Sequence, residues 1–81
     1  MTMTKTMTNQ ERFRFIRAAM VRAGVTNAQI ARDEQVSTEY VYYVLSQKRT
    51  GYRIRLAIAH AVNVPVEELW PDTPPEYRRA A

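Results

Sequence analysis

Two helix-start signals stand only eleven residues apart in this chain, and no other feature restricts the fold as strongly. Thr26 can accept a hydrogen bond from the backbone of a new helix and Gln29 can return one, which together make a capping box. Ser37 has the character of a second N-cap. Eleven residues hold one short helix and a tight turn, so the first helix must end near Glu34 and the second continues to Leu45. This segment therefore predicts a helix, a turn and a helix.

Each of the two starts is framed by apolar residues in the arrangement of a hydrophobic staple, which fixes the angle at which the chain enters a helix. Val25 and Ile30 frame the first start, and Val36 and Val41 frame the second. Ala31 is small enough for the two helices to cross closely beside it. We expect the wedge between the helices to be filled by Ile30, Val36, Val41 and Val44.

Apolar periodicity predicts three further helices around this pair. A capping box at Thr8–Glu11, a stripe of apolar residues and the stop signal Gly24 predict a helix over 9–23. A second stripe from Ile54 predicts a helix that ends near Asn63. Pro65 suits a first helical position and is followed by two glutamates that favour the helix dipole, so a short helix is expected over about 65–70.

Together these signals predict an all-α domain of five helices over residues 9–71, with flexible termini. Residues 1–8 alternate Met and Thr without a helical face, which is typical of a flexible leader. Residues 72–81 hold Pro74 and Pro75 and follow Pro71, so we expect an extended and partly mobile tail. Residues 46–53 are expected to form a polar loop, and Trp70 is expected to close the end of the helical bundle.

Several classes of function are disfavoured by what the chain lacks. Without cysteine, neither a disulfide framework nor a thiolate metal site can form. No run approaches the roughly 18 apolar residues of a membrane span, and residues 1–8 lack the hydrophobic core of a secretory signal. His60 is the only histidine and is expected on a helix surface. We therefore expect a cytoplasmic protein with no membrane partner, no catalytic or metal site, no cofactor and no small-molecule substrate.

The charge balance indicates a different class of partner. Twelve Lys and Arg residues against eight Asp and Glu residues give a net charge of +4 and a pI of about 9.9. A pI above about 9 is the electrostatic footprint of a nucleic-acid-binding domain. Charge alone does not separate such a domain from other small basic proteins.

The segment from Thr26 to Leu45, TNAQIARDEQVSTEYVYYVL, resembles the Cro/lambda-repressor type of helix-turn-helix. The similarity continues through Ile58–Asn63 and ends at Glu67–Pro71, where the Leu-Trp-Pro ending is similar to the Ner-like regulators of Mu-type transposable phages. It covers about residues 9–71. The resemblance implies a lambda-repressor-like fold and a phage transcriptional regulator, acting as a repressor, whose second motif helix enters the major groove of double-stranded DNA.

The resemblance also nominates the residues that would read DNA. In this family the start and outer face of the second motif helix meet the bases, which corresponds here to Thr38, Glu39, Tyr42 and Tyr43, with Ser46 at the far end. Glu39 can accept from cytosine N4, and Thr38 can offer its methyl group to thymine. The paired tyrosines have a second interpretation as a protein interface, where tyrosine is enriched. No Arg or Lys occurs from Thr38 to Gln47, so the usual arginine–guanine contact is missing.

Contacts to phosphate are expected to come from the flanks of this helix. The resemblance places one at Asn27, and Ser37 could combine capping with a phosphate contact. The resemblance places the remaining candidates in the predicted loop after the second motif helix, where family members contact phosphates. They are Gln47, Lys48, Arg49, Tyr52 and Arg53. For the cationic residues among them, Lys48, Arg49 and Arg53, the alternative role is that of an ordinary solvated loop.

Two positions depart from the family pattern. Gln35 occupies the turn slot that usually holds glycine, so a residue with a side chain is expected to adopt positive φ there. Glu34 occupies the preceding slot, which usually holds leucine. Since a carboxylate facing the core would be costly, we expect Glu34 to turn towards solvent or to pair with an arginine.

Three functions remain open from the sequence. The leading hypothesis is a transcriptional regulator that binds DNA as a homodimer, with half-sites about one helical turn apart. The second is an accessory DNA-binding protein of transposition or recombination. The third is a helical module whose tyrosine face binds protein. The salt dependence of binding to duplex DNA separates the third from the other two.

Overall fold

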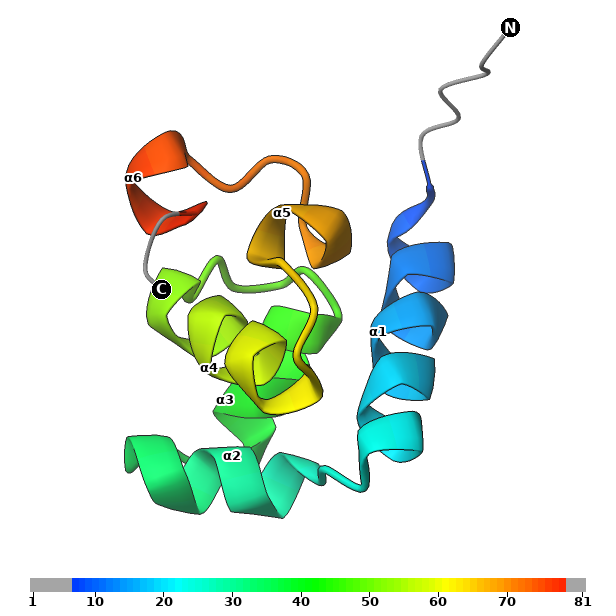
Figure 1. Cartoon of the computed structure of the whole chain (residues 1–81). Coiled ribbons are helices and arrows are strands. Elements are labelled where there is room, and N and C mark those ends of the chain that lie inside the picture. Colours follow the sequence, from blue (N-terminus) through cyan, green and yellow to red (C-terminus); the bar gives the residue numbers. More distant parts are fainter. Residues whose placement is uncertain (1–6, 79–81) are drawn as a thin grey trace, which may run out of the picture.

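The two short helices predicted between Thr26 and Leu45, and the turn that joins them, are present in the computed structural model, which describes residues 7–78 (Figure 1). Within this range the chain forms six helices and no strand, which confirms the all-α class and adds one helix to the five expected. The helices are α1 (Asn9–Ala23), α2 (Asn27–Glu34), α3 (Thr38–Leu45), α4 (Tyr52–Val62), α5 (Val66–Leu69) and α6 (Pro75–Arg78).

The predicted N-caps account for where the first three helices begin. Thr8 accepts from the Glu11 amide at 3.0 Å, and its own amide donates to the Glu11 carboxylate at 2.9 Å. Thr26 and Gln29 repeat this reciprocal pair at 3.1 and 2.9 Å. Ser37 accepts from the Tyr40 amide at 3.0 Å. Each cap satisfies a backbone donor that has no partner inside its helix, so the starts are set locally.

The turn between α2 and α3 is made by a left-handed residue. Gln35 has φ 59° and ψ 45°, as expected for the slot that usually holds glycine. The next amide, of Val36, donates to the Ala31 carbonyl at 3.0 Å, which closes the end of α2 in a Schellman arrangement. The chain therefore bends sharply at Gln35–Val36 instead of continuing α2.

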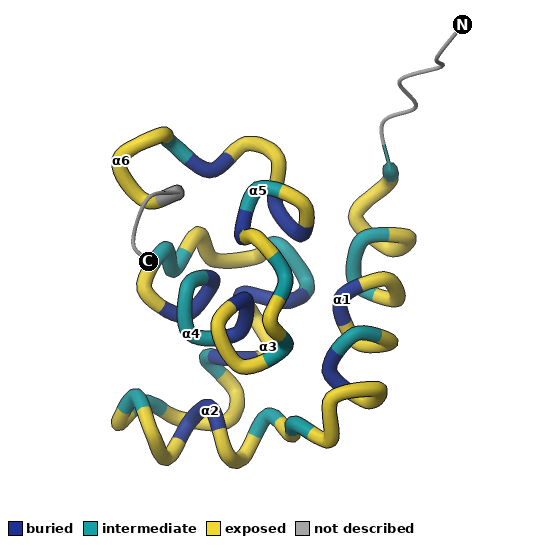
Figure 2. The backbone as a smooth tube through the Cα atoms, in the orientation of Figure 1, coloured by how far each residue is buried: buried dark blue, intermediate teal, exposed yellow. Residues whose placement is uncertain are grey.

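The core lies where α1, α3, α4 and α5 face one another, and Figure 2 shows their buried segments turned towards the middle of the molecule. Ile30 and Ala31 bring α2 into the same cluster, with Val25 and Val36 packed against it. Both expected staples are thus part of the core. Trp70 is fully buried and closes one end of the bundle, as predicted.

The boundaries of two helices differ from the expectation. Helix α4 begins at Tyr52 and not at Ile54, because Gly51 adopts φ 47° and turns the chain into the helix early. A Cβ atom at Gly51 would lie 2.5 Å from a methyl group of Val44, so only glycine allows this close approach. Helix α5 begins at Val66, with Pro65 as its N-cap residue.

The expectation of an extended tail after Pro71 is wrong for residues 72–78. Thr73 is 1% exposed, and its hydroxyl donates to the Trp70 carbonyl at 2.7 Å. The buried guanidinium of Arg55 donates to Asp72 at 3.2 Å and to Thr73 at 3.3 Å. Helix α6 then packs on α4 through Tyr77, whose ring stacks on Tyr52 with centroids 4.7 Å apart. The expected flexibility of residues 1–6 and 79–81 lies outside the described residues.

Substitutions of the left-handed residues at the ends of α1 and α2 are expected to change the free energy of unfolding in opposite directions. Gln35→Gly removes the steric cost of a side chain at positive φ, and we expect it to raise the free energy of unfolding by roughly 0.5–1 kcal/mol. Gly24→Ala introduces this cost at φ 72°, where a Cβ atom would meet no neighbour within 4 Å, so backbone strain alone should act. We expect a loss of about 1 kcal/mol. Urea unfolding measures both changes, and shifts in the same direction would contradict the assigned turn geometry.

Candidate nucleic-acid interface

The outer face of α3 is accessible along the length of the helix. Val41, Val44 and Leu45 are fully buried and define its inner face. At about 100° per residue, the opposite side carries Glu39 and Tyr43. Thr38, Glu39, Tyr42 and Tyr43 are all exposed. The structure thus brings four of the five predicted base-reading residues onto one open surface.

Ser46, the fifth of these residues, is half-buried at the C-cap of α3. Its hydroxyl donates to the Tyr43 carbonyl at 3.3 Å. Its amide donates to the carbonyl of Tyr42 at 2.9 Å. Ser46 therefore ends the helix, and its hydroxyl hydrogen is already used there.

An aromatic cluster joins the outer face of α3 to α1. The ring of Tyr42 meets the ring of Phe13 edge to face, with centroids 5.7 Å apart and an interplanar angle of 76°. The Tyr42 ring also meets the Tyr43 ring, with centroids 6.1 Å apart and an interplanar angle of 61°. Tyr42 keeps 46% of its surface exposed and Tyr43 keeps 36%. Phe13 belongs to the apolar stripe predicted for residues 9–23, whose periodicity gave no sign of a contact with Tyr42.

Positive charge begins directly beyond the end of α3. Lys48 and Arg49 are exposed, and the amides of both donate to the Tyr43 carbonyl, at 2.8 and 3.2 Å. Their backbone is therefore fixed to the last turn of the helix while their side chains reach solvent. Gln47 differs from these neighbours, because it adopts φ 69° and its side-chain amide donates to the Leu45 carbonyl at 2.8 Å.

Arg53 lies in the first turn of α4, not in the loop where it was expected, and it is paired. The Nε atom of Arg53 donates to a carboxylate oxygen of Glu34 at 3.0 Å. Its Nη2 atom donates to the backbone carbonyl of Glu34 at 2.5 Å. This confirms that Glu34 pairs with an arginine. The pair ties the last turn of α2 to α4, and the Arg53 side chain remains 69% exposed.

Tyr52, also in the first turn of α4, is held between two side chains. The Tyr77 ring stacks on it, and the Arg55 guanidinium lies 5.2 Å from its ring centre. Arg55 lies equally close to the Trp70 ring, at 5.4 Å. Tyr52 thus belongs to the packing that joins α4 to the C-terminal segment, and it is half-buried.

The two remaining phosphate candidates lie at helix starts. The hydroxyl oxygen of Ser37 is the N-cap acceptor of α3. Asn27 is the first residue of α2 and is half-buried. It lines a surface hollow of about 530 Å³ together with Arg17, an exposed residue of α1 that the sequence did not single out.

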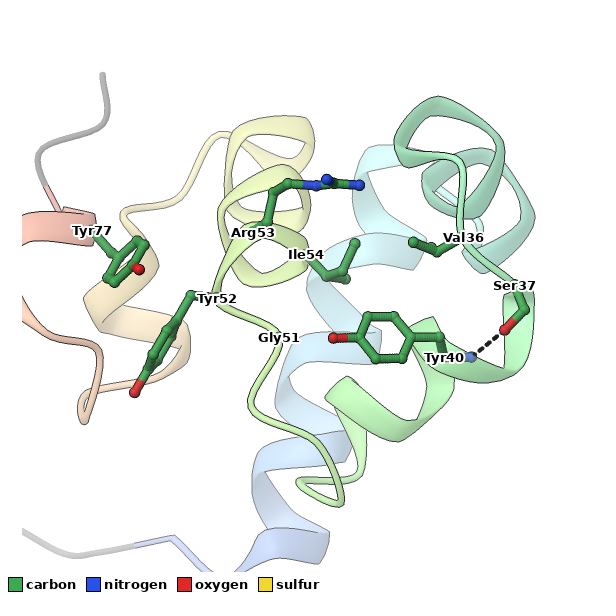
Figure 3. Close-up of a pocket in the computed structure, with 8 residues that line it drawn as sticks. All are labelled: Val36, Ser37, Tyr40, Gly51, Tyr52, Arg53, Ile54 and Tyr77. Atoms are coloured by element: carbon green, nitrogen blue, oxygen red, sulfur yellow. Dashed lines mark hydrogen bonds between the residues drawn. The ribbon is translucent and has the colours of Figure 1, made fainter.

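A groove of about 560 Å³ lies beside α3, between the α2–α3 turn and the first turn of α4 (Figure 3). Tyr40 and Val36 form one side, and Tyr52 and Tyr77 the other. Its one cationic side chain is Arg53, which already holds Glu34. The groove is therefore mainly aromatic and aliphatic, unlike the charged surface at the end of α3.

Residues 7–78 contain no group of three or more His, Cys, Asp or Glu side chains that could hold a metal ion. Over the same range, no helix is both long and apolar enough to cross a bilayer. Comparisons with models of protein families, with curated proteins and with solved structures give no match for this chain.

The Arg53–Glu34 pair predicts unequal effects of its two partners on stability. Glu34→Gln removes the charge but keeps a carbonyl acceptor, so we expect the free energy of unfolding to fall by less than about 0.5 kcal/mol for this exposed pair. Arg53→Ala also removes the donor to the Glu34 carbonyl at the end of α2, and we expect a loss of about 1 kcal/mol. Chemical denaturation of the two variants measures the difference, and a larger loss in Glu34→Gln would contradict the bond to the carbonyl.

Proposed function

We propose that this protein binds double-stranded DNA by inserting α3 into the major groove, and that it acts as a sequence-influenced transcriptional regulator of the phage-repressor type. One observation carries this proposal. The bend at Gln35–Val36 leaves the outer face of α3 accessible, and Lys48 and Arg49 stand exposed directly beyond its last turn.

The dimensions of α3 suit this role. A helix with its side chains is about 10–12 Å across, and the major groove of B-DNA is about 12 Å wide. Helix α3 spans Thr38–Leu45, and its inner face is fixed by three fully buried aliphatic side chains. A helix held in this way can enter a groove without changing its orientation, which keeps the entropy cost of binding low.

Positioning and reading are divided between two surfaces in this proposal. Lys48 and Arg49 supply attraction to phosphates, which positions the protein but carries no sequence information. Thr38, Glu39, Tyr42 and Tyr43 face the base edges. Arg53 contributes less than an unpaired arginine, since Glu34 neutralises its charge. Binding as a homodimer to a two-fold site follows from the resemblance to the Cro/lambda-repressor type.

A second candidate function is supported by the exposed aromatic surface. Tyr42 and Tyr43 of α3 are large side chains with more than a third of their surface exposed. Tyrosine and phenylalanine are enriched at protein interfaces, so α3 could dock on a protein instead. The basic pair at the end of α3 favours DNA, because it would lie beside phosphates when α3 enters the groove.

A salt titration tests the proposal. For a random duplex, we expect log K to fall linearly with log salt concentration, because bound phosphates release counterions. Lys48→Ala should weaken binding to all sequences alike and reduce the slope by about 1. Arg32→Ala is the matched control, since it removes one exposed charge from α2 away from the end of α3. A slope near zero in the parent protein would favour the protein-binding alternative.

A further inference from the structure

We infer that α3 selects its DNA site through thymine methyl groups and exocyclic amino groups, and not through guanine. The inference rests on the proposed function and names the base chemistry that the same surface recognises. Three observations carry it. They are the hydrogen bonds that the polar side chains at the ends of α3 already form, the charge on its outer face, and the packing of its tyrosine rings.

The polar side chains at the two ends of α3 already form hydrogen bonds with the backbone of this helix. The Ser37 hydroxyl oxygen caps its first turn, and the Ser46 hydroxyl hydrogen is donated to the Tyr43 carbonyl. The Gln47 amide is donated to the Leu45 carbonyl. An adenine contact of the bidentate glutamine kind is therefore not offered at Gln47.

The charge on the outer face of α3 disfavours hydrogen bonding to guanine. The major-groove edge of guanine presents two acceptors, N7 and O6, which are read best by the paired donors of arginine or lysine. From Thr38 to Gln47 the one charged side chain is Glu39, and the first cation follows at Lys48. A carboxylate is an acceptor only, so Glu39 facing guanine would place acceptor against acceptor.

Glu39 is instead suited to accept a hydrogen bond from the exocyclic amino group of a base. It lies exposed in the first turn of α3, and residues at the start of a recognition helix are those that reach base edges. Cytosine N4 and adenine N6 both present donors in the major groove. A carboxylate brought close to DNA is repelled by the phosphates, and the bond to an amino group offsets this repulsion.

The rings of Tyr42 and Tyr43 give the same face an apolar character. Phe13 and Tyr43 both contact the Tyr42 ring, with centroids 5.7 and 6.1 Å away, which restricts its rotation while 46% of Tyr42 stays exposed. Aromatic surface and the methyl group of threonine are both suited to packing on the C5-methyl of thymine. Thr38 is exposed at the start of this face.

The tyrosine hydroxyls do not alter this assignment. Within residues 7–78, neither the Tyr42 nor the Tyr43 hydroxyl forms a hydrogen bond. Each stands at the end of a long side chain beyond its ring, where it can donate to a phosphate oxygen at the wall of the groove. The rings then lie over the pyrimidine edge, and phosphate contacts by hydroxyl carry no sequence information.

Base analogues test this inference with the protein unchanged. A preferred duplex is first selected from a random pool and then synthesised in two modified forms. Replacing its thymines by uracil removes only the C5-methyl groups, and we expect affinity to fall about fourfold for each contacted thymine. Replacing its guanines by 7-deazaguanine removes only the N7 acceptor, and we expect affinity to stay within about twofold, since no paired donor reads that edge.

Two variants assign the effect to the named side chains. Tyr42→Phe keeps the ring and should keep the penalty for uracil, whereas Tyr42→Ala should reduce it. Glu39→Gln adds a donor to the acceptor, so we expect it to relax selection at the base pair that Glu39 reads. Lys48→Ala is the control, because it should weaken the parent duplex and both analogues by the same factor.

The opposite pattern would overturn the inference. A loss of more than about tenfold with 7-deazaguanine and none with uracil would show that guanine is read after all. That outcome would leave the proposed function intact, because DNA binding would persist. Binding that shows no salt dependence on any duplex would instead overturn the proposed function, and the base assignment with it.

Discussion

The left-handed backbone at Gln35 closes α2 and turns the chain into α3, and the surface of the molecule depends on this bend. The Schellman bond from the Val36 amide to the Ala31 carbonyl fixes the end of α2, and the cap made by the next residue, Ser37, fixes the start of α3. Buried Ile30, Ala31 and Val41 then hold the two short helices together. A helix of eight residues is marginal by itself in water, so the direction in which α3 points is set by this packing.

A second constraint acts near the C-terminus, where Arg55 holds residues 72–78 against α4. Its guanidinium lies between the Tyr52 and Trp70 rings and donates to Asp72 and Thr73. A buried charge is tolerated when it is paired and hydrogen-bonded, and cation–π contacts add to this. The same contacts that hold residues 72–78 also hold Tyr52, which lies in the first turn of α4, directly after the loop that carries Lys48 and Arg49. The C-terminal segment and the basic end of α3 are thus joined through α4.

Features set by neighbouring residues were predictable from sequence, whereas features set by distant residues were not. The caps at Thr26 and Ser37 and the positive φ of Gln35 depend on a few adjacent positions, and all were predicted correctly. Helix α6 was missed because three prolines dominate that segment locally, while its docking depends on Arg55 and Tyr52 in another helix. The contact between Phe13 and Tyr42 was missed for the same reason. The candidates Ser46 and Gln47 were chosen by alignment to a family pattern, which could not reveal that their side chains bond to the end of α3.

The most direct test of the proposed interface is to follow the backbone amide signals of the protein by NMR while a short DNA duplex is added. If α3 enters the major groove, the largest shifts will fall on Thr38, Glu39, Tyr43 and the amides of Lys48 and Arg49. The signals of α6 and of the exposed side of α4 will change little. Shifts concentrated around Tyr40, Tyr52 and Tyr77, with α3 unaffected on its outer face, would contradict the account and place the contact in the groove instead.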